Sequence, residues 1–263
     1  MTAVDGVEGC ALVGMVHLSA LPGSPGWAGD VAAVRARALR DAGALLAGGC
    51  DAVIVENMAD LPYLKGAVGP DTLACMTLCV ADVVSLGAPV GVQVLAGANA
   101  QALAVAGVTG ASFIRAEAFA YGHLADEGWI EACAGPLLRQ RATDGLGHVR
   151  IWADVRKKHA AHAVTADLPL EALARGHRFC GADVLVVTGG ETGASTPLVD
   201  VQEAARAGLP IAVGSGVTPR DAATLGRTAG ALVVGSWLKR DGDWRQEVDV
   251  ERVRRVRSAL DQA

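Results

Sequence analysis

The region that most constrains the fold is residues 211–242, where one local unit occurs twice. The apolar run 211–215 ends in Gly-Ser, and so does the apolar run 231–236. Between them, residues 219–227 are expected to form a helix that has Pro in its first turn and Thr218 as its N-cap. Because this connection is short, the two runs are expected to pair in parallel through a right-handed crossover. Both Gly-Ser ends then lie at one edge of the sheet.

The rest of the chain repeats this alternation of apolar runs and helical segments. Further strands are expected at residues 12–18, 51–55, 90–95, 112–116, 149–155 and 183–187. Further helices are expected at residues 31–47, 71–86, 98–106, 130–141, 169–180, 198–207 and 248–263. Such alternation is typical of parallel α/β proteins. The chain has 263 residues, and a (β/α)8 barrel typically needs about 250. We therefore predict an α/β fold, a single (β/α)8 TIM barrel with one domain over residues 1–263, with an open doubly wound sheet as the alternative.

Charge and hydropathy limit the partners of the chain. The net charge is -5 and the basic residues are dispersed, which argues against a nucleic-acid partner. No apolar run approaches the roughly 18 residues of a membrane span, and the first residues lack a secretory signal pattern. We expect a cytoplasmic protein without a membrane span. Because barrels of this type are often dimers or larger, we also expect a homo-oligomer.

The Gly-Ser ends of the last two strands predict an anion site. Backbone N–H groups freed by glycine beside a helix N-terminus bind anions, and loops seven and eight of (β/α)8 barrels commonly hold a phosphate. The Gly-rich turn 188–193 after the sixth strand offers further amides and hydroxyls. The alternative is that these glycines only permit tight turns. The candidate phosphate-binding residues are Thr188, Gly189, Gly214, Ser215, Gly216, Gly235 and Ser236.

Ionisable residues gather at the C-terminal ends of the predicted strands. By the two-residue alternation of a strand, Arg115 and Glu117 share one face. An outward charge would be buried under helices, so these side chains are expected to point into the barrel mouth. The same reasoning applies to Asp154 and His17. Carboxylates in such a mouth suit acid/base catalysis, and Lys158 suits charge stabilisation or a Schiff base. The candidate catalytic residues are His17, Glu56, Arg115, Glu117, Asp154 and Lys158; the alternative is a structural network of salt bridges.

Other potential ligands give weaker patterns. A divalent metal held by Glu56, Asp154 and a histidine is conceivable, but the chain has no compact ligand motif. We therefore predict no metal site and leave the cofactor open. The six cysteines lack CxxC spacing and are expected to be small buried thiols. His159 is a further acid/base candidate, and the remaining histidines are expected at the surface: His123, His148, His162 and His177.

Several blocks in this order resemble the BtpA/SgcQ family. They are GMVHLSALPGSP (14–25), VENMADLPY (55–63), FIRAEAF (113–119), ADVRKKHA (153–160), VTGGETG (187–193), VGSGVT (213–218) and VGSWLK (234–239). The resemblance implies a barrel of the ribulose-phosphate-binding type. It also implies either a role in photosystem I accumulation or, in another branch, a place among sugar-metabolism proteins called nucleosidases. The matching residues are His17, Glu56, Asn57, Asp60, Arg115, Asp154, Lys158 and His159.

The chain departs from the family pattern at two places. After the third strand it has Leu95-Ala96-Gly97-Ala98-Asn99 where the family usually shows Arg-Asn-Asp. After the strand-four arginine it has Glu117 where the family usually has Asn. These changes alter charged groups at the mouth. They favour a substrate or step that differs from the typical member, and they argue against a photosynthetic role.

The leading functional hypothesis is an enzyme that acts on a small phosphorylated metabolite, either a sugar phosphate or a nucleotide-like compound. Its carboxylates favour cleavage of an N-glycosidic bond. One alternative is an isomerase or lyase that abstracts a proton beside a carbonyl. Another is a non-catalytic assembly factor that uses the barrel as a scaffold. For the enzyme, Asp154→Asn and Glu56→Gln are expected to abolish turnover and leave the melting temperature nearly unchanged.

Overall fold

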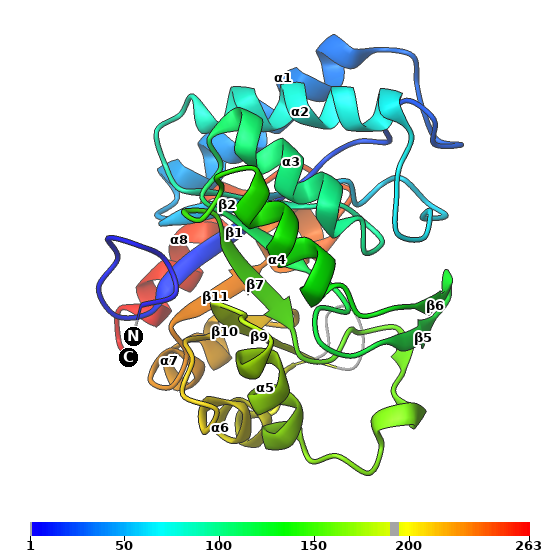
Figure 1. The fold of residues 1–263 in the computed structure, drawn as a ribbon. Helices are drawn as coiled ribbons and strands as arrows, with labels where there is room; N and C mark the ends of the chain where they lie inside the picture. Colours follow the sequence, from blue (N-terminus) through cyan, green and yellow to red (C-terminus); the bar gives the residue numbers. More distant parts are fainter. Residues whose placement is uncertain (1, 190–194) are drawn as a thin grey trace.

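Eight parallel strands close a barrel in the computed structural model, which describes residues 2–189 and 195–263. Their order around the barrel is β1-β11-β10-β9-β7-β4-β3-β2. Figure 1 shows the strands enclosed by the helices. Their bounds are β1 Ala11–His17, β2 Ala52–Glu56, β3 Val90–Gln93, β4 Phe113–Ala116, β7 Arg150–Asp154, β9 Val184–Thr188, β10 Ile211–Gly214 and β11 Ala231–Val234. Pairing of β11 with β1 closes the ring. The predicted TIM barrel is therefore confirmed.

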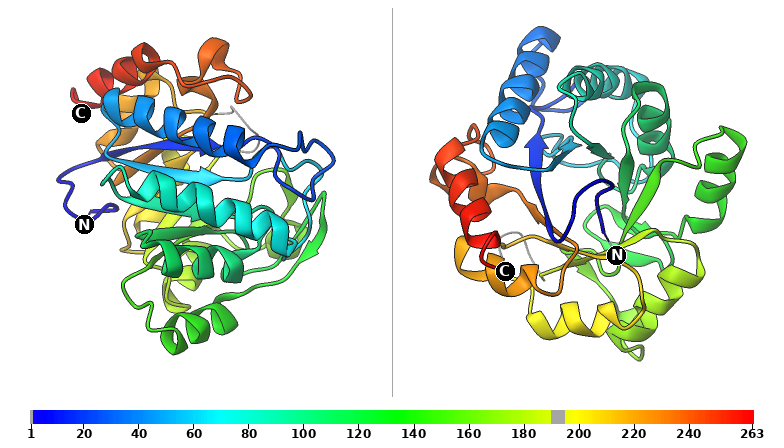
Figure 2. Two further views of the ribbon diagram at one scale, coloured as in Figure 1. Left: turned by 90° about the horizontal axis from the view of Figure 1, so that it is seen from above. Right: turned by 90° about the vertical axis from the view of Figure 1, so that its left-hand side faces the viewer.

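Helices surround the strands in a ring, which Figure 2 shows from the end of the barrel. Their bounds are α1 Val31–Ala47, α2 Pro70–Val84, α3 Asn99–Thr109, α4 Ala134–Thr143, α5 Leu170–Phe179, α6 Leu198–Ala205, α7 Pro219–Gly226 and α8 Val250–Leu260. The predicted cap of α7 is confirmed, since the Thr218 hydroxyl accepts a hydrogen bond from the amide of Arg220 at 3.3 Å. Within the described ranges, no helix combines the length and apolarity needed to cross a bilayer.

A small antiparallel sheet interrupts the βα alternation after β4. It consists of β5 His123–Ala125, β6 Gly128–Ile130 and β8 Ala160–Ala161. The hairpin pairs Leu124 with Trp129, and Leu124 also pairs with Ala161 from the segment after β7. The predicted helix 130–141 therefore begins later, at Ala134, because residues up to Ile130 belong to this sheet. Short 3-10 turns complete the fold: η1 Ala163–Thr165, η2 Ser236–Leu238 and η3 Arg240–Gly242.

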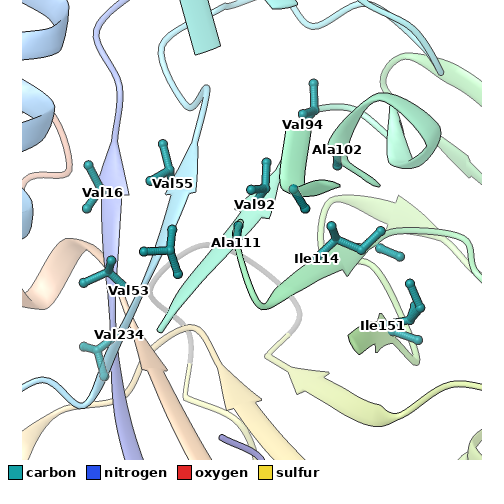
Figure 3. Close-up of a cluster of buried hydrophobic side chains, with 14 of the residues drawn as sticks. Val16, Val53, Val55, Val92, Val94, Ala102, Ala111, Ile114, Ile151 and Val234 are labelled. Atoms are coloured by element: carbon teal, nitrogen blue, oxygen red, sulfur yellow. The ribbon is translucent and has the colours of Figure 1, made fainter. Parts of the chain in front are cut away.

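The barrel has one hydrophobic layer outside the strands and another inside. Outward residues such as Val16, Val55 and Ile114 pack against the helices (Figure 3). Inward residues form the second layer: Val13, Met15, Ile54, Phe113, Trp152, Val184, Val186, Ala212 and Val233. Since alternate strand residues face alternate sides, the polar residue two positions after an inward apolar one also points inward. This alternation directs the functional side chains toward the mouth at the C-terminal ends of the strands.

The opposite end of the barrel is filled by aromatic rings and by the start of the chain. Phe113 and Trp152 stack with ring centroids 4.3 Å apart. Gly91 makes room for them, because a Cβ there would lie 2.2 Å from the Phe113 ring. Ala3 and Val4 pack against the same inner layer, and Arg150 donates a hydrogen bond to the Ala3 carbonyl at 2.6 Å. The N-terminal segment lies inside the ring in Figure 2.

Candidate active site

The six predicted catalytic side chains lie together around the barrel mouth. Two cavities meet there and share the side chains of Glu56, Met58, Arg115 and Lys158. The glycine lobe, of about 170 Å³, is lined by Met15, His17, Ser215, Gly216, Val217, Thr218, Val233, Val234, Gly235, Ser236, Trp237 and Gly242 in addition. The aromatic lobe, of about 290 Å³, is lined by Leu61, Tyr63, Gln93, Leu95, Glu117, Asp126, Glu127, Asp154, Lys157, His159, Trp244 and Arg245 in addition.

Arg115 and Asp154 form a buried ion pair between adjacent strands. Arg115 Nη2 donates to Asp154 Oδ1 at 3.0 Å, and Arg115 Nε lies 3.2 Å from each carboxylate oxygen. The register of β4 with β7 places Arg115 opposite Trp152, two residues before Asp154 on the same strand. Both side chains are nearly inaccessible to solvent. The pair fixes the guanidinium at the boundary between the two lobes.

His17 and Glu56 form a second pair, across β1 and β2. These residues are register partners, and His17 Nε2 lies 3.5 Å from Glu56 Oε2. Burial lowers the pKa of His17 well below its ordinary value, and Lys239 adds to the effect. Burial raises the pKa of Glu56, with Lys158 and Arg115 opposing it. His17 is therefore a neutral imidazole near pH 7. A Cβ at position 235 would lie 3.1 Å from its ring, so Gly235 permits this close approach.

Glu117 lies at the floor of the aromatic lobe. Its Oε2 is buried and has no hydrogen-bond partner among the described residues. Burial raises its pKa to about 7, and the Lys157 ammonium 3.7 Å away opposes that rise. Lys157 also donates to Glu127 Oε2 at 2.9 Å, and Glu127 belongs to the turn of the β5–β6 hairpin. Glu117 thus titrates near neutral pH, where a carboxyl group can both accept and donate a proton.

Glu117 is expected to make the free energy of unfolding fall as pH rises from about 4.5 to about 7. A carboxyl whose folded pKa is raised favours the folded state while it is protonated. That contribution is fully present below the ordinary glutamate pKa of 4.5 and is lost as pH rises through about 7. Urea unfolding at pH 5 and pH 8 measures the change. Glu117→Gln should remove this part of the pH dependence, so superimposable pH profiles for both proteins would contradict the assignment.

Lys158 lies between the lobes, and burial lowers its pKa, with Arg115 contributing in the same direction. A lysine of this kind is a better proton donor and a better nucleophile than an exposed one. It therefore offers a cation or an amine at the centre of the site. Within residues 2–189 and 195–263, no group of three His, Cys, Asp or Glu side chains is arranged to hold a metal ion.

The glycine lobe contains four of the predicted phosphate-binding residues: Ser215, Gly216, Gly235 and Ser236. After β10, Ser215 and Gly216 both have a positive φ, of 73° and 65°. This conformation is unfavourable for serine. It turns the chain sharply before Thr218 caps α7. Ser215 and Gly216, which follow β10, therefore line the glycine lobe together with Gly235 and Ser236, which follow β11. Backbone amides at such loop ends can bind an anion.

The other predicted phosphate-binding residues lie at the edge of this lobe. Gly214 faces the barrel interior, where a Cβ would lie 3.7 Å from Arg115 Nη2. The Thr188 hydroxyl donates to the Arg156 carbonyl at 3.1 Å, so it stabilises the loops after β7 and β9. Gly189 follows Thr188 directly and does not line either lobe. The remainder of the predicted turn, residues 190–193, lies outside the described residues.

Sequence reasoning is wrong about two histidines and misses several side chains. His123 and His177, expected at the surface, are only 3% and 1% exposed, because both belong to elements that fold back onto the barrel. The matching residues Asn57 and Asp60 have a structural role, since Asn57 donates to Asp60, which accepts from the Leu21 amide. The missed site residues are Tyr63, Gln93, Glu127, Lys157 and Trp244. Tyr63 and Lys157 lie within the sequence blocks 55–63 and 153–160, whereas the other three lie outside every block.

Similar solved structures share the fold of this chain. KGPDC from Streptococcus mutans superposes with a TM-score of 0.62 at 10% identity, covering 97% of this chain and 99% of that one. N-(5'-phosphoribosyl)anthranilate isomerase from Pyrococcus furiosus superposes with a TM-score of 0.58 at 12% identity, covering 97% of this chain and 100% of that one. A 3-hexulose-6-phosphate synthase superposes with a TM-score of 0.59 at 14% identity, covering 95% of this chain and 99% of that one. At these identities the likeness shows the barrel alone.

Relatives in sequence extend over nearly the whole chain. An uncharacterized mitochondrial protein of Caenorhabditis elegans is 38% identical over 91% of this chain and 89% of its own length. The photosystem I biogenesis protein BtpA of Synechocystis is 38% identical over 92% of this chain and 85% of its own length. The model of the BtpA family matches residues 9–262. The chain therefore belongs to the BtpA family, as the ordered sequence blocks predicted.

Proposed function

We propose that this protein is an enzyme that transfers a proton on a small phosphorylated, sugar-like substrate. The observation that carries the proposal is the junction of the two lobes. A glycine-rich cradle opens directly onto a buried cluster of titratable groups through Glu56, Arg115 and Lys158. Binding of a phosphate in the cradle would orient the reacting end of the substrate against these groups.

Glu117 is the proposed general base. Its pKa of about 7 matches the ambient pH, which is the condition for efficient proton transfer. Removing a proton beside a carbonyl places negative charge on the carbonyl oxygen. Lys158 and the fixed guanidinium of Arg115 supply positive charge at the centre of the site to stabilise it. Lys158 can also form a Schiff base with the carbonyl, as its lowered pKa permits.

This arrangement favours an isomerase or lyase over a glycosidic hydrolase. A hydrolase needs two carboxyl groups free to act on the leaving group and on water. Here both oxygens of Asp154 contact Arg115, and Glu56 contacts His17. Glu117 Oε2 lies 3.7 Å from the Lys157 ammonium but accepts no hydrogen bond in the described part of the chain, which leaves it available as a single base. The names of the structural neighbours, which include an isomerase of a phosphoribosyl compound, support the same choice.

The proposed phosphate site is tested by a charge placed in the cradle. Ser236→Asp is expected to reduce the affinity for ribose 5-phosphate by about tenfold or more, because the new carboxylate repels the phosphate dianion. The affinity is measured by isothermal titration calorimetry in phosphate-free buffer. Ser258→Asp is the matched control, since Ser258 is exposed on α8 and lines neither lobe. Equal affinities in the two variants would place phosphate outside the glycine lobe.

The name of the Synechocystis relative supports a second candidate, a non-catalytic assembly factor. A scaffold would leave its ionisable groups paired and would show no affinity for phosphorylated compounds. Failure of inorganic phosphate, ribose 5-phosphate and nucleoside monophosphates to raise the melting temperature of the wild-type protein would favour that candidate. A ligand specific for the folded state raises stability with the logarithm of its concentration, so a dose-dependent shift would favour the enzyme.

A further inference from the structure

One part of the wall of the aromatic lobe is apolar and held in place. Met58, Leu61, Tyr63, Leu95 and Trp244 form this part. The Tyr63 hydroxyl donates to the Met58 carbonyl at 2.9 Å, which fixes the position of the phenol ring. The Trp244 indole packs edge-on against the His17 imidazole, with ring centroids 6.3 Å apart. Such a wall favours a flat, weakly hydrated group over a polyol chain.

The Trp244 indole also contacts Arg245, which lines the same lobe. The guanidinium carbon of Arg245 lies 4.8 Å from the centroid of the indole ring. This cation–π contact and the contact with His17 restrain the indole from two directions. A restrained aromatic wall loses little conformational freedom when a planar ligand stacks on it. Trp244 is therefore suited to a stacking contact.

The floor of the same lobe offers hydrogen-bond acceptors. Gln93 Oε1 and Glu117 Oε2 are buried, and neither has a hydrogen-bond partner in the described ranges. These two residues come from β3 and from the end of β4, which pair with each other in the barrel. Buried acceptors without donors are unfavourable, so native sites usually supply the missing partner. Because Glu117 is the proposed base, Gln93 Oε1 is the acceptor left for a ligand edge that carries an N–H donor.

We propose that the aromatic lobe binds a planar heterocycle with an N–H donor on its edge. This inference rests on the proposed function, which places a phosphate in the glycine lobe and the sugar-like part between the lobes. A plain sugar phosphate would leave the cavity of about 290 Å³ to water. The substrate class is then a phosphorylated sugar that carries both a carbonyl group and a planar ring. A nucleoside 5'-monophosphate has the phosphate and the ring but no sugar carbonyl, so it serves as a binding probe for this class. The apolar part of the wall stacks on the ring, and Gln93 accepts a hydrogen bond from its edge.

Calorimetry on the full-length protein with matched probes tests this inference. The probes are ribose 5-phosphate, the 5'-monophosphates of adenosine, guanosine, cytidine and uridine, and the same four nucleosides without phosphate. At least one monophosphate is expected to bind about tenfold or more tightly than ribose 5-phosphate, since stacking of a base on an aromatic side chain contributes at that level. Its nucleoside is expected to bind more weakly than the monophosphate, because it cannot use the glycine lobe.

Two variants test whether the higher affinity for the monophosphate than for ribose 5-phosphate comes from the aromatic lobe. Trp244→Ala is expected to reduce the affinity for the preferred monophosphate about tenfold and to change that for ribose 5-phosphate by less than about twofold. Gln93→Leu keeps a similar side-chain volume and removes the hydrogen-bond acceptor. It should therefore also reduce the affinity for the monophosphate more than the affinity for ribose 5-phosphate. Trp129→Ala is the matched control, because Trp129 is 43% exposed on β6 and lines neither lobe. Melting temperatures verify that each variant is folded.

The outcomes separate the two proposals. Ribose 5-phosphate binding as tightly as every monophosphate would overturn the inference about the ring and leave the proposed function standing. A preference for monophosphates that persists in both Trp244→Ala and Gln93→Leu would also overturn it, since the ring would then bind elsewhere. Lack of affinity for every phosphorylated probe would overturn the proposed function itself.

Discussion

Glu117→Gln is expected to reduce turnover by about 10²–10⁴, the usual contribution of a positioned general base. Glutamine keeps the shape of the side chain and cannot accept the proton. The measurement uses the phosphorylated compound that most raises the melting temperature of the wild-type protein. Glu131→Gln is the matched control, because Glu131 is exposed and precedes α4 outside both lobes. Full activity in Glu117→Gln would assign the base to another residue.

The pH dependence of the wild-type rate gives an independent check of this role. A base works in its deprotonated form, so kcat/KM of the free enzyme is expected to rise with pH through about 7, the pKa of Glu117. The same ionisation lowers stability over this interval. Activity and stability should therefore change in opposite directions as pH rises from about 5 to about 8. A rate that falls with pH over this interval would instead require Glu117 to act as an acid.

Asp154→Asn is expected to lower the free energy of unfolding by about 3–5 kcal/mol, because it leaves the buried Arg115 guanidinium without its counter-ion. This prediction differs from the expectation of an unchanged melting temperature, which treated the carboxylate as a free catalytic group. The hydrogen bonds of 3.0–3.2 Å to Arg115 show that it is an ion-pair partner as well. Urea unfolding at pH 7 measures the loss.

A double variant distinguishes loss of the pair from loss of packing. Arg115→Met combined with Asp154→Leu removes both charges, and it should destabilise the protein less than Asp154→Asn alone. Glu56→Gln provides a second comparison. Since burial penalises the charged form of Glu56 and so raises its pKa, a neutral amide there should not lower stability as Asp154→Asn does. A double variant less stable than Asp154→Asn would show that the pair contributes net stability through its geometry.

Much of the fold could be predicted from the sequence because barrel strands and helices have local signatures. The helix at residues 31–47 has the predicted bounds, and Thr218 caps α7 as its sequence context indicates. The sheet of β5, β6 and β8 could not be predicted in the same way. Its strands are two or three residues long, too short for a hydrophobic period to be recognised. The pairing of β5 with β8 also joins Leu124 to Ala161, which are far apart in the chain.

The site residues on the barrel strands could be predicted, because the alternation of inward and outward side chains can be read within a single strand. The alternation of inward residues placed Arg115 and Asp154 in the mouth, and the structure brings them together. Side chains supplied by loops were predicted only in part: Lys158 was predicted as a site residue, whereas Lys157 was not. Lys157 and Lys158 are adjacent in sequence, yet Lys157 contacts Glu117 and Glu127, while Lys158 lies at the junction of the lobes. Only the path of the chain after β7 distinguishes their roles.

The N-terminal residues that fill one end of the barrel limit the routes by which small molecules can reach and leave the candidate site. Ala3 and Val4 pack in one cluster with Phe113 and Trp152, so within residues 2–189 and 195–263 these side chains fill that end of the barrel axis. In the proposed enzyme, the substrate would then enter and the product would leave by the same opening at the mouth. Each turnover would have to empty this shared route before the next molecule can use it.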